Sequence, residues 1–319
     1  MDSRGERLSG EQLLRWRRSL LSAGGRPADL DWLIDLAGGL GWQALQAVRL
    51  HPERSLQLRL SCQALAALWQ RHLEADEPLQ YLIGRCPWRD LELAVAPGVL
   101  IPRAETELLV DLAQQLLIPQ RELIPQQLLI PQQPSSPPRL LIPPLPPANW
   151  ADLGTGSGCL AVALARLWPE SRGFAVDLSP QALAQAGANL VAAGLSDRVQ
   201  TICGSWWQPL AAQRGLLELV VANPPYIPTA MWRQLEPLVR DHEPAMALDG
   251  GADGLDAIRS IVVGASVHLA PGGLLLLEHH HDQSSAVLAL LRQSGLEAVC
   301  GHSDLEGTLR FASARRPID

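Results

Sequence analysis

The sequence predicts an α/β protein in which a doubly wound, mostly parallel sheet follows a small helical domain. Three observations support this prediction. From residue 149 onward, short apolar strand patterns alternate strictly with helical patterns, which is typical of a parallel sheet with right-handed crossovers. Residues 1–80 carry apolar side chains at helical spacing, interrupted by glycine pairs and prolines. A glycine-rich turn joins the first strand of the second part to the helix that follows it.

The N-terminal domain, residues 1–80, is predicted to contain four helices. Its apolar spacing gives helices over 10–22, 28–38, 41–48 and 57–74. No residue in this stretch indicates chemistry, so we expect a small helical domain.

Residues 81–116 differ from the helical part. Gly84 and Pro87 predict a turn, after which DLELAVA alternates like a strand. The segment 105–116 begins with charged residues and then has helical spacing. We therefore expect a β-hairpin linker and a first helix here.

Residues 117–148 are of low complexity. The tripeptide LIP recurs in six-residue phase, and ten of the 26 prolines lie in this window. Proline at this density blocks both helices and central strands. We expect an extended insertion in a surface loop, rather than a proline-rich site for a partner.

The last domain, residues 149–319, carries the alternating pattern. Strands are predicted at WADLG, GFAVDL, VQTICG, LELVVA and LLLLEH, and two more at EAVCGHS and TLRFASA. Helices are predicted at CLAVALARLW, SPQALAQAGANLVAAG, 254–269 and 283–294.

Composition narrows the function classes. The formal net charge of −7 argues against a duplex nucleic acid as a stable partner, because phosphate contacts need a basic excess. The five cysteines are scattered and never form a C-x-x-C pair, so we expect neither a disulfide framework nor a zinc site. The N-terminus lacks the apolar core of a signal peptide, and no apolar run approaches the ~20 residues of a membrane span. We expect a cytoplasmic monomer.

The first chemical signal is a glycine loop after the first strand of the sheet, which follows Asp152. Glycines there let the backbone approach a ligand closely, and the next helix offers free N–H groups to an anion. The spacing G-x-G-x-G differs from the dinucleotide fingerprint and lacks the lysine of a P-loop. A ligand with a carboxylate and no phosphate suits this loop. Its residues are Gly154, Thr155, Gly156, Ser157 and Gly158.

The second signal is Asp177, at the carboxyl end of the next strand. Doubly wound folds bind the two hydroxyls of a ribose with an acid at this position. Capping of the following helix is the structural alternative, although Ser179 can supply that cap by itself.

The third signal, Asn223-Pro224-Pro225-Tyr226, follows the fourth strand of the sheet. Two prolines stiffen the turn and remove its N–H groups, so the Asn223 amide and the Pro224 carbonyl are held as an acceptor pair. Such a pair suits a planar NH2 group, each hydrogen of which binds one acceptor while the Tyr226 ring packs on its face.

Together these signals resemble a class I S-adenosylmethionine-dependent methyltransferase with a Rossmann-like sheet. Further segments, PLQYLIG, LIPRAETELLV, NPPYIP, LLLLEH and DLEGTLRF, resemble the protein-(glutamine-N5) methyltransferases of the HemK/PrmC type. That family modifies peptide chain release factors. The resemblance covers both ends of the chain and omits only residues 117–148.

The resemblance implies a role for each motif. The loop from Gly154 to Gly158 would hold the methionyl end of S-adenosyl-L-methionine, Asp177 its ribose and Trp206 its adenine. Asn223 to Tyr226 would bind the glutamine of a Gly-Gly-Gln loop in the release factor, and the helical domain would provide docking area. No metal is implied.

Three residues depart from the family pattern. Ser205 stands where the family has an acid before the adenine-stacking aromatic residue, which leaves recognition of the adenine amino group open. Ala104 replaces a proline and Trp88 a phenylalanine, and both are expected to be tolerated packing changes.

The sequence leaves three alternative functions open. They are a ribosomal-protein glutamine methyltransferase, a nucleic-acid adenine N6-methyltransferase, and a non-catalytic binding module. The run His279-His280-His281 is expected to be a solvated loop rather than a metal site, because adjacent side chains of an extended segment point to opposite faces. Arg103 and Glu107 are candidates for a cleft between domains or for a structural ion pair.

Overall fold

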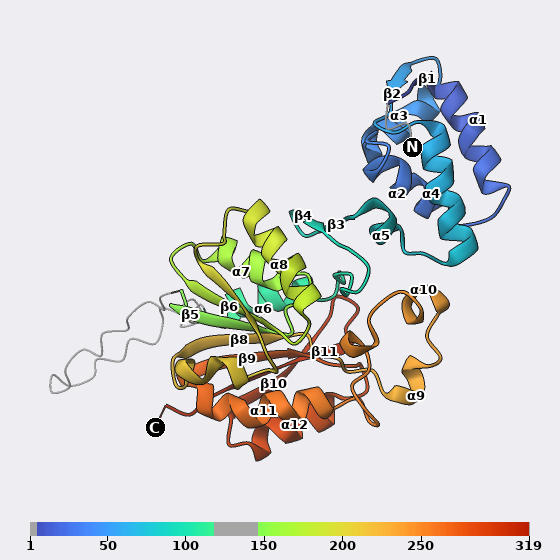
Figure 1. Cartoon of the computed structure of the whole chain (residues 1–319). Helices are drawn as coiled ribbons and strands as arrows, with labels where there is room; N and C mark the ends of the chain where they lie inside the picture. The colour runs from blue at the N-terminus through green and yellow to red at the C-terminus, as the bar shows by residue number, and fades with distance from the viewer. Residues whose placement is uncertain (1–4, 118–145, 319) are drawn as a thin grey trace, which may run out of the picture. The chain divides into compact units, whose positions relative to one another are not determined.

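The computed structural model describes residues 5–117 and 146–318 (Figure 1). Most of the proline-rich stretch predicted at 117–148, namely 118–145, lies outside the described residues. The described parts form two compact units. The smaller unit comprises residues up to Cys86 together with 94–101 and 234–244, and the larger unit contains the rest. None of the described helices is long and apolar enough to cross a bilayer.

The larger unit is built around a seven-stranded sheet of order β10-β11-β9-β8-β5-β6-β7 (Figure 1). Strands β9, β8, β5, β6 and β7 pair in parallel with their neighbours. Strand β11 is antiparallel to both of its neighbours, β9 and β10. This confirms the predicted doubly wound, mostly parallel sheet. The strands are β5 (Asn149–Leu153), β6 (Arg172–Asp177), β7 (Val199–Cys203), β8 (Leu217–Ala222), β9 (Leu269–Glu278), β10 (Glu297–Ser303) and β11 (Leu309–Arg315).

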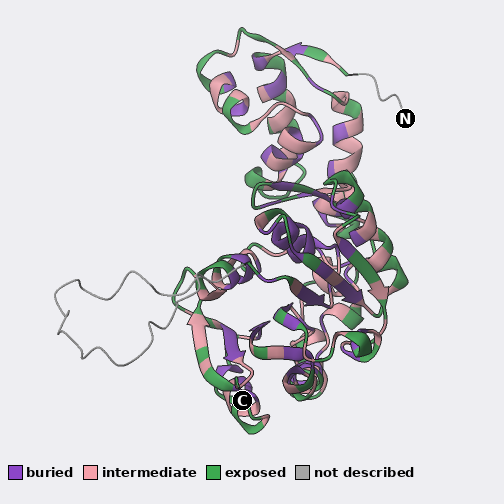
Figure 2. Cartoon of the chain, turned by 90° about the vertical axis from the view of Figure 1, so that its left-hand side faces the viewer, coloured by how far each residue is buried: buried purple, intermediate pink, exposed green. Residues whose placement is uncertain are grey.

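Helices cover both faces of this sheet, because its central strands are apolar on both sides (Figure 2). Trp150 and Leu219 pack toward one helix layer, and Ala151 and Val220 toward the other. The first layer contains α6 (Glu107–Leu117), α7 (Cys159–Leu167) and α8 (Pro180–Ala192). The second contains α11 (Asp256–His268) and α12 (Ser284–Gln293).

The register of the parallel strands brings their carboxyl ends into one row. Leu153 of β5 is paired with Val176 of β6 and with Ala222 of β8, and Ala222 is paired with Leu277 of β9. The residues that follow each strand therefore emerge at the same edge of the sheet. This edge is where ligands bind in doubly wound folds.

The smaller unit has a helical core around Leu13, Leu30, Leu65 and Trp69, all of which are buried. Its helices are α1 (Gly10–Leu21), α2 (Pro27–Leu36), α3 (Trp42–Leu50), α4 (Cys62–Ala75), α5 (Leu79–Ile83) and α10 (Pro237–Arg240). The first three helices lie within two residues of their predicted bounds.

Three local predictions are wrong. The helix predicted from residue 57 begins at Cys62, because Ser55–Gln57 forms β2, which pairs with β1 (Arg7–Ser9). The segment 81–84, predicted as the start of the hairpin, lies mostly in α5. Pro87 lies inside β3 (Arg85–Trp88) rather than in a turn. Strand β3 pairs with β4 (Leu91–Ala94), and Arg89, at φ +52°, lies in the turn between them.

The remaining short elements are η1 (Gln208–Gln213), α9 (Thr229–Trp232) and η2 (Ala245–Ala247).

Candidate active site

The glycine loop turns the chain from β5 into α7 through three left-handed residues. Gly154, Gly156 and Gly158 have φ values of +76°, +56° and +81°. A Cβ atom on Gly158 would lie 3.0 Å from Cα of Ala186, so a side chain here would displace α8. A Cβ atom on Gly156 would have no neighbour closer than 4.0 Å, so the space above this residue is open.

Backbone hydrogen bonds hold the loop against β6. The N–H groups of Gly154 and Thr155 both donate to the Val176 carbonyl, at 2.8 and 2.9 Å. Asn189 of α8 donates from Nδ2 to the carbonyl of Ser157 at 2.8 Å. Helix α7 then begins after Gly158, which has no side chain to cap it, and the N–H of Ala161 in its first turn interacts with the Asp152 carboxylate.

Asp177 is attached to the same loop. Its Oδ2 accepts the N–H of Gly156 at 2.9 Å, and its Oδ1 accepts the N–H of Ser179 at 2.8 Å. Ser179 caps α8 through Ala182, as the sequence predicted. Burial raises the pKa of Asp177 above its usual range, and the N–H donors oppose that shift.

Asp152, the last acid before the loop, is fully buried. Its Oδ2 accepts the hydroxyl of Thr155 at 2.7 Å, while its Oδ1 has no hydrogen-bond partner among the described residues. Burial raises the pKa of Asp152 to about 7, although the Thr155 bond acts in the opposite direction.

Trp206 lies beside the glycine loop. A Cβ atom on Gly154 would come within 3.3 Å of its ring. Its backbone φ of +46° is rarely adopted by a bulky residue, so the backbone of the turn after β7 is strained at Trp206. Ser205, just before it, is exposed.

The Asn223-Pro224-Pro225-Tyr226 turn is fixed by side chains from distant segments. Nδ2 of Asn223 donates to Oγ1 of Thr106 at 2.8 Å, and that hydroxyl lies 2.7 Å from Oε2 of Glu278. The Tyr226 hydroxyl donates to Oε1 of Glu278 at 3.0 Å. No described residue donates a hydrogen bond to Oδ1 of Asn223 or to the carbonyl of the buried Pro224.

Glu278 is a buried acid at the carboxyl end of β9. Burial raises its pKa to about 7, and the hydrogen bonds from Thr106 and Tyr226 oppose the shift. Burial also raises the pKa of Tyr226, and the neighbouring Glu278 charge adds to this effect. Tyr226 is therefore a neutral hydrogen-bond donor at physiological pH.

The loop around Gly250 packs against the Asn223-Pro224-Pro225-Tyr226 turn. A Cβ atom on Gly250 would lie 2.6 Å from the carbonyl of Pro225, so only glycine allows this approach. Gln283 donates from Nε2 to the carbonyls of Tyr226 and Asp253, at 2.9 and 3.1 Å. A pocket of about 390 Å³ opens along this loop, lined by residues between positions 245 and 257.

Comparison with known proteins identifies the family. A family model for a methyltransferase domain matches residues 151–240. A release factor glutamine methyltransferase of Prochlorococcus marinus is 45% identical over 309 residues, which cover 97% of this chain and 98% of that protein. Proteins of the same name from Synechocystis and Thermosynechococcus vestitus are 36% and 38% identical and are covered over 97% and 100% of their lengths. The chain belongs to the release factor glutamine methyltransferase family.

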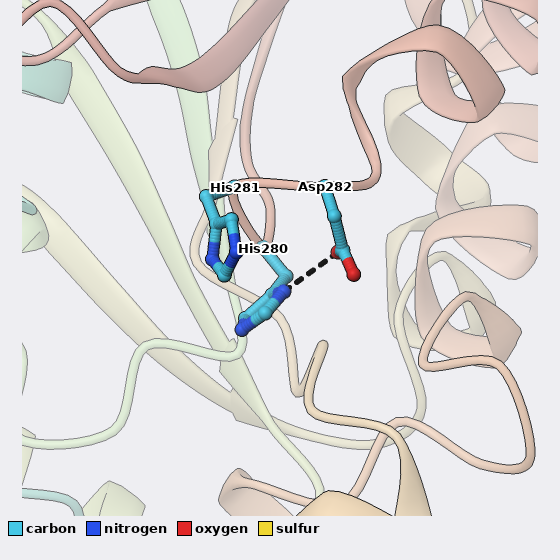
Figure 3. Close-up of side chains that lie close together, drawn as sticks. All are labelled: His280, His281 and Asp282. Carbon is cyan, nitrogen blue, oxygen red and sulfur yellow. Dashed lines mark hydrogen bonds and ion pairs between the residues drawn. The ribbon is translucent and has the colours of Figure 1, made fainter.

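The ring of His280 lies 6.3 Å from the ring of Tyr226. Figure 3 shows His280 beside His281 and Asp282. The prediction of a solvated loop is wrong for His279, which is fully buried and has a pKa lowered by that burial. The rings of His280 and His281 lie 4.1 Å apart, rather than on opposite faces, because the strand already ends at Glu278. Asp282 accepts a hydrogen bond from Nδ1 of His280 at 2.6 Å through Oδ1 alone, and one ligand atom from each of His280, His281 and Asp282 lies within 4.8 Å of the others.

Glu107, a candidate for a cleft or an ion pair, binds the hairpin. Its Oε1 accepts the N–H of Arg89 at 2.9 Å, and Arg89 also pairs with Asp111. The carbonyl of Arg103 accepts the indole N–H of Trp88 at 2.7 Å. Both contacts anchor the hairpin in the larger unit.

The sequence indicates site residues after the first, second and fourth strands of the sheet, but three residues that hold these segments in place were not predicted from it. Thr106 and Glu278 lie within segments that resemble the release factor glutamine methyltransferases, yet neither was singled out. The available signal for Glu278 was the one that identified Asp177, namely an acid that ends an apolar strand. No sequence pattern indicated Gln283.

Proposed function

We propose that this chain transfers a methyl group from S-adenosyl-L-methionine to the side-chain amide nitrogen, N5, of a glutamine in a peptide chain release factor. The observation that carries this proposal is the orientation of the Asn223 amide. Its NH2 group is bound to Thr106, which leaves Oδ1 as an acceptor beside the Pro224 carbonyl. An acceptor pair of this kind matches the two hydrogens of a primary amide.

The glycine loop supports the cofactor half of the proposal. S-adenosylmethionine supplies an electrophilic methyl group on a sulfonium when it is bound. The uncapped N-terminus of α7 suits its carboxylate, and the open space at Gly156 leaves room for it. The Asp177 oxygens keep lone pairs for ribose hydroxyls, and the Trp206 ring beside Gly154 offers a stacking surface for adenine.

The acceptor half addresses the low reactivity of an amide. The nitrogen lone pair is delocalised, which is why rotation about an amide bond costs ~18–20 kcal/mol. Hydrogen bonds from the substrate NH2 to Asn223 and Pro224 favour a pyramidal, electron-richer nitrogen. With the cofactor bound, they would also position the nitrogen for attack on the methyl group, and such positioning supplies a large part of catalysis in two-substrate reactions. The transfer breaks the sulfonium–methyl bond, leaves the thioether S-adenosylhomocysteine and releases one N–H proton.

The name shared by the relatives supports a release factor as the substrate. We propose that the helical unit contacts the body of the release factor while the glutamine of its Gly-Gly-Gln loop enters the site. A further docking surface would explain specificity for a whole protein rather than for free glutamine.

The test is transfer of radiolabelled methyl from S-adenosylmethionine to a purified release factor. A factor with Gln→Ala in its Gly-Gly-Gln loop, a ribosomal protein and DNA serve as controls. We expect label on the intact factor alone, and a loss of about a hundred- to a thousand-fold for Asn223→Ala. Asn149→Ala, at the opposite end of β5, is a matched control that keeps full activity.

Two results would overturn the proposal. Label on DNA or on the ribosomal protein instead of the factor would assign the same chemistry to a different acceptor. Absence of label on every acceptor, with a folded enzyme, would favour a non-catalytic module.

A further inference from the structure

Asn223, Thr106, Glu278 and Tyr226 form one continuous chain of side-chain hydrogen bonds. The three links measure 2.8, 2.7 and 3.0 Å in that order. Thr106 and Glu278 are almost completely buried, with 2% and 1% of their surfaces exposed. Buried polar groups at this depth must satisfy one another, so the direction of each bond is constrained.

The direction of the chain follows from the donor capacity of each group. An ionised Glu278 carboxylate only accepts, so Thr106 must donate its single hydroxyl hydrogen to Oε2. The Thr106 oxygen is then left with acceptor capacity alone. The Asn223 group that faces it must be the NH2 rather than the carbonyl oxygen. This assignment does not depend on telling nitrogen from oxygen by shape.

We propose that Thr106 and Glu278 are positioning residues that lock the Asn223 amide with Oδ1 toward the substrate. The inference rests on the function proposed above and names two residues that act through Asn223 rather than on the substrate. The reversed amide would present its own NH2 to the substrate NH2, and two donors cannot bind each other. Methyl transfer therefore requires the orientation that Glu278 imposes through Thr106.

Tyr226 closes the other end of the chain. Its hydroxyl occupies Oε1 of Glu278, so the carboxylate cannot rotate away from Thr106 without losing a second bond. The same turn thus contributes both the residue that is oriented, Asn223, and the residue that steadies the acid behind it. Thr106 comes from the segment just before α6, so the lock also ties this segment to the turn.

A pair of substitutions at Thr106 separates this role from packing. Thr106→Val keeps the shape and removes the hydroxyl, whereas Thr106→Ser keeps the hydroxyl and removes a methyl group. The lock predicts that Thr106→Val lowers kcat by about ten- to a hundred-fold, since small misplacements of a positioned group have effects of this size. Thr106→Ser stays within about threefold of the wild type. KM for the release factor and affinity for S-adenosylmethionine change little, because docking and cofactor contacts lie elsewhere.

The opposite pattern would overturn the inference. A packing role predicts that Thr106→Val is active and that Thr106→Ser is the impaired variant. Equal losses in both variants with a lowered melting temperature would also reject the lock. Glu278→Gln is the second variant, and the lock predicts a loss in kcat there as well, because the new amide can donate to Thr106 and reverse the chain.

A measurement that does not need activity separates this inference from the proposed function. In protein labelled with ¹⁵N at asparagine side chains, the Asn223 NH2 signals are those absent from Asn223→Ala. One of these hydrogens is bound to Thr106, so we expect its shift to change in Thr106→Val and to persist in Thr106→Ser. Unchanged signals in Thr106→Val would reject the lock even if the wild type methylates the factor. A wild type that transfers no label but shows this pattern would reject the proposed function alone.

Discussion

The two halves of the site are held in different ways. In the cofactor half, the glycine loop with Asp177 and Trp206, most of the hydrogen bonds involve backbone groups. Apart from Trp206, all of its residues lie between Asp152 and Asn189. In the acceptor half, the turn with Asn223 and Tyr226, side chains from segments far apart in the sequence are joined by hydrogen bonds. Thr106 is 117 positions from Asn223 and 172 from Glu278. The first half is built mainly from one βαβ segment, while the second requires the segment before α6, the turn after β8 and the end of β9 to be brought together.

This difference has consequences for substitutions. A backbone-built site depends on conformations that only certain residues adopt, so it is broken by adding atoms. A side-chain network depends on matched donors and acceptors, so it is broken by exchanging isosteric groups. The two kinds of change can therefore be used to disturb one half without the other.

The largest effect is expected at Gly158. Gly158→Ala places a Cβ atom 3.0 Å from the backbone of α8 at a φ of +81°, so both the clash and the strain apply. We expect the free energy of unfolding to fall by about 2–3 kcal/mol, with loss of cofactor binding. Denaturant titration and calorimetric titration with S-adenosylmethionine measure the two effects.

Gly156→Ala is the matched control within the same loop. Its φ of +56° lies in the small left-handed region that alanine can reach, and no atom lies within 4.0 Å, so the loss of stability should be about 1 kcal/mol. Cofactor affinity should still fall, because the new methyl group enters the open space. Equal stabilities of the two variants would contradict the packing role of Gly158.

A smaller effect, specific to the acceptor half, is expected from the titration of Glu278. Its pKa of about 7 means that about a tenth of the acid is ionised at pH 6. Protonated Glu278 can donate to Thr106 and release the Asn223 lock, so kcat should fall about tenfold from pH 8 to pH 6. Glu105, whose charge raises this pKa, and Arg310, whose charge lowers it, face the same carboxyl group. Glu278→Gln should lose this inflection.

Stability should respond to Glu278 in the opposite direction. The folded pKa, about 7, lies above the ordinary value of 4.5, so the folded state binds the proton more tightly than the unfolded state. The stabilising contribution is complete below pH 4.5 and is lost as pH rises through 7. The melting temperature of the wild type should therefore gain more than that of Glu278→Gln when pH falls from 8 to 5.5. Asp152, which also titrates near 7, stays in both proteins and cancels.

The same contrast explains how much of the molecule the sequence predicts. The sheet and its flanking helices follow from local periodicity, and these predictions are confirmed. The site residues follow from loops that end strands, and their roles stay predictions. A hydrogen bond between residues more than 100 positions apart produces no periodic pattern in the sequence, so Thr106 and Glu278 were not predicted as site residues. Strands β1 and β2 were not predicted for a related reason. Each has only three residues and is recognisable only from its pairing with the other.

The errors near the histidine run have a local cause. The segment was expected to continue as an extended chain, which would alternate its side chains. Strand β9 instead ends at Glu278, and a turn stabilised by the His280 N–H and the Gln283 side chain follows. A long-range partner of the turn, the Tyr226 carbonyl, holds Gln283 in place.

The smallest effect is expected at Ser205, where the family resemblance of the sequence leads us to expect an acid. Ser205 is exposed next to Trp206, which lies against Gly154. Ser205→Asp should add an acceptor for the adenine amino group and raise affinity for S-adenosylmethionine about fivefold, the usual value of one solvent-accessible hydrogen bond. Calorimetric titration measures the gain, with Ser205→Ala as the control that lacks an acceptor. An analogue with oxygen in place of the adenine amino group should show no gain. A gain that persists with this analogue would mean that the new charge acts on the sulfonium or amino group instead, and that adenine is read by the backbone alone.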